Sequence, residues 1–312
     1  MNLIELINRY INYIEKIKRN SEGIVYRNFF FEPPEKFNDN NSQEWIKVYT
    51  NGIIERCDLS SITGLLRSER WLKSLHESLH NKNLFIFAAS LRGLIESSAD
   101  SFFLLHVLLD RLFDFFPYFY MIQNDYKNID FYISFDDIEK KLIHFSFAKK
   151  QKDKNEILPD HDPKTNKEYI SYIETFLKLE RLTELYYELC NLTHPASPSV
   201  FCFIDEYNDK YILNISKESE LIYQMLKKYE KTIFNLIAGS VDYLLMALVI
   251  LDKLYKNSKV IGNLTTLKNE RFLNEISKID SFISEYNCGK FDASNFIQDL
   301  KVKGYKITLF TE

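Results

Sequence analysis

The stretch LFIFAASLRGLIESSADSFFLLHVLLDRL, residues 84–112, decides the fold class. Its mostly apolar side chains recur at steps of four and three, which places them on one stripe of a single long helix. The stripe consists of Leu84, Ala88, Leu91, Ile95, Ser98, Phe102, Leu105, Leu109 and Leu112. Phe87, Leu94 and Leu108 lie off the stripe. A helix that is apolar on more than one side is expected at the centre of the fold.

The composition of the whole chain favours long helices. Its 312 residues include only 8 glycines and 7 prolines, so there are few positions that would break a helix. We therefore predict a mainly α protein, a helical bundle built on long central helices with a small β-hairpin. The central helix 84–116 is expected to pack against helices over 167–193 and 217–257.

The remaining elements follow from periodicity and from helix breakers. Apolar periodicity predicts further helices, over 2–19, from Ser60 or Ser61 to about His80, and over 264–286. Proline is expected to end or kink two helices, at Pro117 and at Pro195. Short β-rich runs predict a strand or turn at 45–49, a strand followed by a helix within 130–150, a hairpin at 199–215, and a strand in the C-terminal YKITLF. The intervening 20–43 and 151–166 are expected to be loops.

These elements suggest a division of the chain into three parts. Residues 1–59 form an N-terminal helix and loop region, residues 60–258 a helical core, and residues 259–312 a C-terminal helical extension.

Charge and cysteine usage indicate a cytoplasmic protein. The formal net charge of −4 gives no overall attraction to nucleic acid. Four cysteines lie far apart without a CxxC pair, which is typical of reduced thiols in the cytosol. The apolar run 232–251 nearly reaches membrane length, but Asn235 and Asp242 interrupt it, so no membrane association is expected.

One motif with chemical potential is His76-Glu77-Ser78-Leu79-His80, a literal HExxH. On a helix His76 and His80 face the same way and could hold zinc, with Glu77 as general base. The segment that begins at Glu96 resembles the third-ligand helix of thermolysin-like zinc proteases. A zinc-dependent hydrolase using these four residues is one functional alternative. The other is that the histidines simply face solvent on an amphipathic helix.

A second candidate is the pair formed by Arg92 and Glu96, one turn apart inside the apolar helix. A charge there is costly unless it is paired, so an ion pair that fixes helix packing is one interpretation. In the other, Arg92 lines a polar pocket and holds a phosphate or a carboxylate.

A third candidate is His194, in the run CNLTHP that closes the helix over 167–193. A histidine at a helix C-terminus can bind the last carbonyls and is favoured by the helix dipole. A Cys190–His194 nucleophile pair would also fit the i,i+4 spacing.

The combination SLRGLIESSAD (90–100) and YYELCNLTHPAS (186–197) resembles bacterial all-helical proteins related to HEPN domains. The resemblance implies a cytosolic protein of a stress, toxin–antitoxin or antiviral defence system, acting as an RNase-like effector or as a non-catalytic binding subunit. Catalytic HEPN domains cleave RNA without a metal. Their histidine handles the proton of the ribose 2′-hydroxyl, and a nearby arginine steadies the phosphate.

Carried over to this chain, the resemblance assigns the histidine role to His194. The positions that would hold the arginine are occupied by Tyr187, Glu188 and Leu189. Arg92 could supply the guanidinium only if its helix packs face to face with the helix that ends at His194. The candidate catalytic residues are therefore Arg92, Glu96 and His194, without a cofactor, and zinc belongs only to the alternative above.

The expected partners are a protein or a second copy of the chain, because aromatic residues are abundant, with 20 Tyr and 25 Phe. RNA is the candidate ligand under the RNase interpretation. A basic cluster of Lys149, Lys150, Lys152 and Lys154 could touch its phosphates or could simply be a solvated loop.

Overall fold

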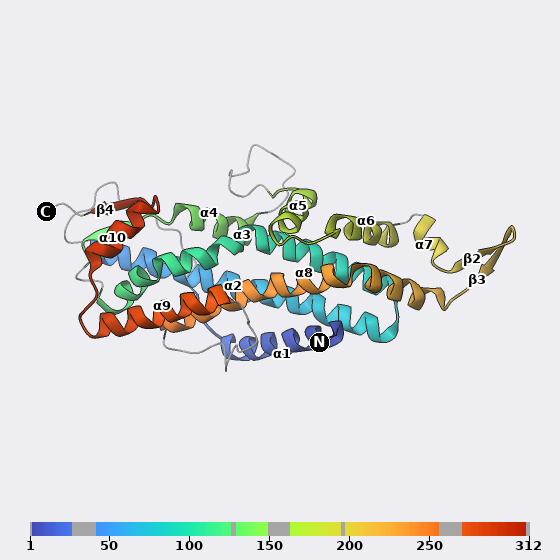
Figure 1. Ribbon diagram of the computed structural model, residues 1–312, viewed down its shortest axis with the longest axis horizontal. Coiled ribbons are helices and arrows are strands. Elements are labelled where there is room, and N and C mark those ends of the chain that lie inside the picture. The colour runs from blue at the N-terminus through green and yellow to red at the C-terminus, as the bar shows by residue number, and fades with distance from the viewer. Residues whose placement is uncertain are drawn as a thin grey trace. The chain divides into compact units, whose positions relative to one another are not determined.

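The structure is a computed structural model, and it describes residues 2–26, 42–125, 129–148, 163–194, 197–255 and 270–309. The protein is mainly α-helical with two small antiparallel sheets, as predicted (Figure 1). The chain forms two compact units. Unit 1 comprises residues 1–19, 63–104 and 163–243, and unit 2 comprises residues 20–62, 105–162 and 244–312. The three-part division expected from the sequence stays a prediction.

Three long helices contribute residues to both units: α2 (Ser42–Asn81), α3 (Leu84–Asp125) and α8 (Lys217–Tyr255). Unit 1 further contains α1 (Leu3–Ser21), α5 (Asn166–Phe176), α6 (Leu182–Thr193), α7 (Ser197–Phe201) and the hairpin of β2 (Ile204–Tyr207) and β3 (Lys210–Leu213). Unit 2 further contains β1 (Phe131–Ile133), α4 (Asp136–Phe147), α9 (Glu270–Asn287), α10 (Ala293–Val302) and β4 (Ile307–Leu309).

The predicted central helix is α3. Every member of its stripe is buried except Leu109, which is partly exposed, and the off-stripe residues Phe87, Leu94 and Leu108 are buried as well. In unit 1 the ring of Phe102 contacts Phe176 and Tyr243 at centroid distances of 5.2 Å, so α3 packs against the end of α5 and against α8. The predicted packing of the central helix is confirmed in this unit.

Small residues allow close helix approaches in unit 1. A Cβ atom at Gly93 would lie 2.6 Å from the Trp71 indole, so α3 passes over this ring only because the position is glycine. A Cβ atom at Gly239 would lie 2.6 Å from Leu177 Cδ1. The absence of a side chain at Gly239 therefore lets Leu177 pack closely against α8. The non-helical backbone in α8 is at Tyr229, with φ −121° and ψ 15°, and not at Gly239.

Unit 2 is organised around an aromatic cluster. The ring of Phe135, which precedes α4, lies 5.1 Å from Phe115 and 5.3 Å from Phe119. Antiparallel pairing of β1 with β4 brings Phe131 opposite Leu309, so the two predicted short strands are confirmed and form one sheet. Buried aromatic surface of this kind contributes strongly to the stability of a core.

Two sequence predictions are wrong in α2, and one of two alternatives is wrong in α3. Residues 45–49 are helical, and Trp45 and Tyr49 stack on each other at 4.9 Å within α2. Ser61 does not begin a helix; its hydroxyl donates to the Cys57 carbonyl inside α2. Pro117 lies inside α3 and does not end it, because the buried aromatic residues around it outweigh the roughly 3 kcal/mol that an internal proline costs, whereas the alternative of a kink at Pro117 stays a prediction.

Two further predictions need correction in unit 1. The helix expected over 167–193 is two helices, α5 and α6, separated at 177–181, where Lys178 and Arg181 have positive φ. The hairpin is confirmed, but SVF at its start belongs to α7. The hairpin projects from the helices of its unit (Figure 1). The basic cluster at 149–154 and the start of the helix expected at 264 lie outside the described residues.

Candidate functional site

The candidate site begins with an ion pair on α3. Arg92 and Glu96 are one turn apart, and the Nε atom of Arg92 lies 3.0 Å from Oε1 of Glu96. Both side chains are partly exposed, at 26% and 30%. The pair is therefore neither a fully buried structural ion pair nor a freely solvated one, and a ligand in solvent can reach it.

The second part of the site comes from α6. The break between α5 and α6 places Arg181 at φ 63°, where its guanidinium binds Glu184 and lies over the Tyr229 ring at 5.0 Å. Arg181 is thus engaged by other residues of unit 1. The helix that restarts at Leu182 carries its C-terminal end toward Arg92.

The two parts meet at the guanidinium of Arg92. Its Nη1 atom lies 3.1 Å from Thr193 Oγ1 and 3.3 Å from His194 Nε2. Glu96 Oε1 accepts a second hydrogen bond, from the Tyr186 hydroxyl at 2.7 Å. The sequence left this convergence conditional on face-to-face packing, and the structure brings Arg92, Glu96 and His194 together.

Local backbone structure presents His194 to solvent. Its N–H donates to the Cys190 carbonyl at 3.0 Å as the last helical bond, and its own backbone is extended, with φ −96° and ψ 152°. A residue that precedes proline favours this conformation. Thr193 donates to the Leu189 carbonyl, which fixes its oxygen as an acceptor for Arg92. The exposed imidazole therefore lies beside a positioned guanidinium.

The protonation states suit anion binding. Partial burial opposes the charge of Arg92, but the hydrogen bond to Glu96 and the nearby Cys190, Glu96 and Tyr186 groups together outweigh it and keep the pKa of Arg92 above its usual value. Burial, together with the hydrogen bond to Glu96, raises the pKa of the Tyr186 hydroxyl, which stays a donor. Within the described part of the chain, Nη2 of Arg92 and Nδ1 of His194 make no hydrogen bond. These groups remain available to a phosphate or carboxylate.

The sequence patterns assign no site role to Tyr186 or Thr193. A signal was present, because Tyr186 and Thr193 are seven residues apart, about two turns, and so lie on one side of α6 next to His194. Tyr186 also contributes its ring, with the Arg92 guanidinium 5.9 Å from the centroid.

The HExxH residues lie apart from this site on α2. His76 is half-buried, while Glu77 and His80 are exposed. Among the described residues, no three histidine, cysteine, aspartate or glutamate side chains are grouped so that they could hold a metal ion. Oε1 of Glu96, the expected third ligand, already accepts from Arg92 and Tyr186. The geometry gives the zinc alternative no support.

The four cysteines are all free thiols. Cys190 is partly exposed and close enough to Arg92 for its charge to matter, but no orienting group completes a nucleophile pair with His194 in the described residues. Cys57 is fully buried, and burial raises the pKa of its thiol beyond the physiological range.

Comparison with known proteins adds no assignment: no family model, curated protein or solved structure matches this chain. One helix among the described residues, α8, is long and apolar enough to cross a membrane by length and composition, and 67% of its most apolar window is buried inside the structure. The core helix of a soluble protein has the same properties.

Proposed function

We propose that this protein is a HEPN-like, metal-independent RNase-type effector of a bacterial stress or antiviral system, with its active site at Arg92, Glu96 and His194. The observation that carries the proposal is the 3.3 Å approach of Arg92 Nη1 to His194 Nε2 across two helices. Cleavage of RNA without a metal needs a base for the ribose 2′-hydroxyl and a cation for the phosphate, side by side.

Arg92 and His194 would have separate roles in RNA cleavage. A scissile phosphate would take the donors of Arg92, which would release Nε2 of His194 from its contact with the guanidinium. The imidazole would accept the 2′-hydroxyl proton while the 2′-oxygen forms a bond to phosphorus and the bond to the 5′-oxygen breaks. The leaving 5′-oxygen would take a proton from solvent. The products would be a 2′,3′-cyclic phosphate and a 5′-hydroxyl.

The other polar groups would position Arg92. Glu96 binds Nε and is itself held by the Tyr186 hydroxyl, while Thr193 binds Nη1. These contacts restrict the guanidinium to one orientation, so that less conformational entropy is lost when the phosphate binds. Glu96 would be a positioning residue, because its carboxylate faces the arginine and not the open side of the imidazole.

The test is RNA cleavage by the full chain in the presence of a chelator. His194→Ala should lower the rate at least about 100-fold, since a lost general base typically costs that much. His80→Ala is the matched control, because it removes another exposed histidine of unit 1 and also one of the zinc ligands. Equal activity of the His194 variant and the parent would overturn the proposal. Loss of activity in chelator or in Glu77→Gln would favour the zinc hydrolase instead.

A second candidate is a non-catalytic subunit that binds a protein partner. The observation that favours it is the apolar surface of the hairpin, where Tyr211, Ile212 and Leu213 are exposed by 68%, 51% and 76%. A soluble protein rarely leaves several large apolar side chains together in water without a binding role. This candidate gains if the parent protein and the His194 variant are equally inactive on RNA and equally able to bind the partner.

A further inference from the structure

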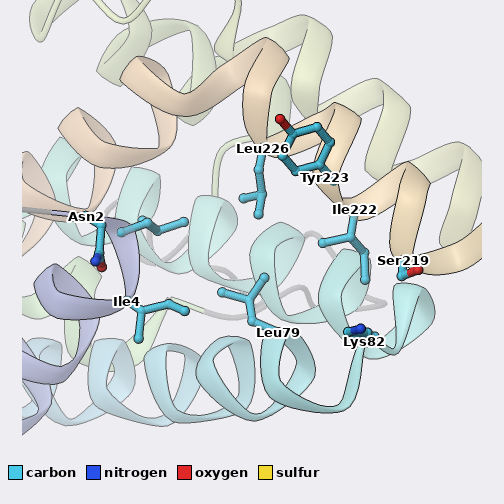
Figure 2. Close-up of a pocket in the computed structure, with 9 residues that line it drawn as sticks. Asn2, Ile4, Leu79, Lys82, Ser219, Ile222, Tyr223 and Leu226 are labelled. Atoms are coloured by element: carbon cyan, nitrogen blue, oxygen red, sulfur yellow. The ribbon is translucent and has the colours of Figure 1, made fainter.

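Unit 1 contains a groove that shares no residue with the Arg92 site. It lies where the N-terminal end of α1, the C-terminal end of α2 and the N-terminal turns of α8 meet, and 9 residues line it (Figure 2). Its volume is about 490 Å³. Pockets that hold small ligands span roughly 300–1,000 Å³, so this groove falls within their size range.

Aliphatic side chains form the walls of the groove. Ile222 and Leu226 lie one turn apart on α8, Leu79 comes from the last turns of α2, and Ile4 from the first turn of α1. The ring of Tyr223 stands above them with 65% of its surface exposed, and Ile4 is 48% exposed. An apolar ligand that covered this surface would remove it from water, which is favourable.

One charged side chain lines the groove. Lys82 follows the end of α2 with φ 53° and lies beside Ser219, while Ile4 lies on the other side of the groove (Figure 2). In the part of the chain that the structure describes, Lys82 makes no ion pair.

Two carboxylates on the helices that line the groove accept backbone hydrogen bonds. Glu218 accepts from the Leu84 N–H at 3.3 Å, and Glu5 accepts from the Asn2 N–H at 3.1 Å. Because Lys82 makes no ion pair within the described residues, its amino group is available to an anion at one end of the groove.

Polar residues bound the apolar surface on both sides. Glu5 and Asn8 are exposed on α1, and Glu220 and Gln224 are exposed on α8. A docked helix would need an apolar seam extending over two or more turns, with anchors at i, i+3, i+4 and i+7. The short aliphatic wall with a cation at one end fits a compact amphipathic anion better than it fits a protein helix.

We propose that this groove binds an acyl carboxylate, with the alkyl chain along Leu79, Ile222 and Leu226 and the carboxylate on Lys82. The charge complementarity of Lys82 and the limited length of the apolar wall argue for this occupant. The site is independent of the proposed RNase function, since neither its residues nor its chemistry involve Arg92 or His194.

The first test is calorimetric titration of the full chain with decanoate and with decanol. The parent should bind both. Lys82→Gln should lower the affinity for decanoate roughly threefold to fivefold, the range expected for one solvent-accessible ion pair. It should leave the affinity for decanol unchanged. Lys227→Gln is the matched control, because Lys227 is also an exposed lysine of unit 1 but does not line the groove. Failure of the parent to bind either compound would overturn the proposal.

A second variant tests the apolar wall. Leu226→Trp should fill the groove and lower the affinity for both compounds at least about tenfold, while a parental melting temperature would show that the fold is intact. If Lys82→Gln and Leu226→Trp both bind decanoate as the parent does, the ligand binds elsewhere and the proposal is wrong. If an amphipathic helical peptide displaces decanoate and binds more tightly than it, the occupant is a protein partner and the acyl assignment is also wrong.

Discussion

Two arginine clusters on α3, one in each unit, use similar side chains in different ways. In unit 1, Arg92 meets one carboxylate, Glu96, and an exposed histidine, His194. In unit 2, Arg111 lies 2.8 Å from Asp137 and 3.9 Å from Asp114. Each cluster also contains a tyrosine hydroxyl that donates to a carboxylate, from Tyr186 and from Tyr305.

The difference lies in charge balance and in what each arginine connects. In the Arg111 cluster two carboxylates neutralise Arg111 and Lys303, and the bonds join α3 to α4 and to the segment before β4. The Arg111 guanidinium also lies 5.0 Å from the Tyr305 ring. Among the residues that the structure describes, Arg92 forms an ion pair with one carboxylate only, and it contacts an imidazole where Arg111 has a second carboxylate. The Arg111 cluster therefore has the composition of a structural cross-link, and the Arg92 cluster that of a site for an anion.

The largest expected effect is on activity. Arg92→Ala should lower chelator-resistant RNA cleavage about 100-fold or more, because a preorganised donor to the reacting phosphate is lost. Arg111→Ala should leave the rate unchanged at a temperature where it is folded. Single-turnover cleavage assays measure both. Equal losses in the two variants would show that the clusters do not differ in function.

The second expected effect is on the free energy of unfolding, and here the Arg111 variant should lose more than the Arg92 variant. Arg111→Ala should lower the free energy of unfolding by about 2 kcal/mol, since it removes charge-assisted hydrogen bonds to Asp137 and Tyr305. Arg92→Ala should lower it by about 1 kcal/mol or less, because Arg92 has a single carboxylate partner, Glu96, in a partly exposed ion pair. Urea unfolding followed by circular dichroism measures the difference. A larger loss for Arg92→Ala would make that cluster the structural one.

The tyrosines offer a finer comparison. Tyr305→Phe removes one acceptor of Arg111 and one donor to Asp114. It should lower the free energy of unfolding by about 1 kcal/mol. Tyr186→Phe should cost less in stability but should lower cleavage severalfold, because Glu96 then holds Arg92 less firmly. The two variants are compared by unfolding and by cleavage on the same preparations. A Tyr186 variant with full activity would show that Glu96 needs no support.

The smallest effect concerns Asp242, a carboxylate with a tyrosine partner that makes no ion pair within the described residues. Asp242 accepts from the Tyr10 hydroxyl at 2.7 Å within unit 1, and burial raises its pKa despite this hydrogen bond. The folded state therefore binds more protons than the unfolded state between the usual aspartate pKa and the raised one. Stability should fall as pH rises through that window and should stay lower above it.

Asp242→Asn should remove this dependence, because the amide oxygen can still accept from Tyr10 without carrying a charge. Unfolding at several pH values from about 4 upward, where an aspartate normally titrates, measures the slope for parent and variant. A parental slope that is unchanged in the variant would place the titrating group elsewhere.

The fold was largely predictable because the apolar stripe of α3 and the face of α1 follow helical periodicity closely. The errors came from tertiary packing. Trp45 and Tyr49 have strand-like propensities, but they are helical because they pack on Tyr132 and Phe135 of unit 2. The break before α6 could not be predicted from a glycine, because the residues with positive φ there are Lys178 and Arg181.

The candidate site was predictable in its members but not in its assembly. Because a charge inside an apolar helix is costly unless it is paired, the sequence predicted that Arg92 and Glu96 form a pair. The proline after His194 predicted that the helix ends there. Nothing in the spacing showed that these two segments meet, because residues 92 and 194 are distant in sequence. The contact depends on the direction that α6 takes after the break at 177–181, which local sequence signals do not specify.

The most direct test of the central claim is cleavage of an RNA with a single 2′-deoxy substitution at the scissile nucleotide, in chelator. If His194 acts on the 2′-hydroxyl beside Arg92, the all-ribose substrate should be cut to a 2′,3′-cyclic phosphate and a 5′-hydroxyl, and the substituted RNA should resist cleavage at that position. Cleavage of the deoxy-substituted site at the same rate, or no cleavage of either RNA, would contradict the account.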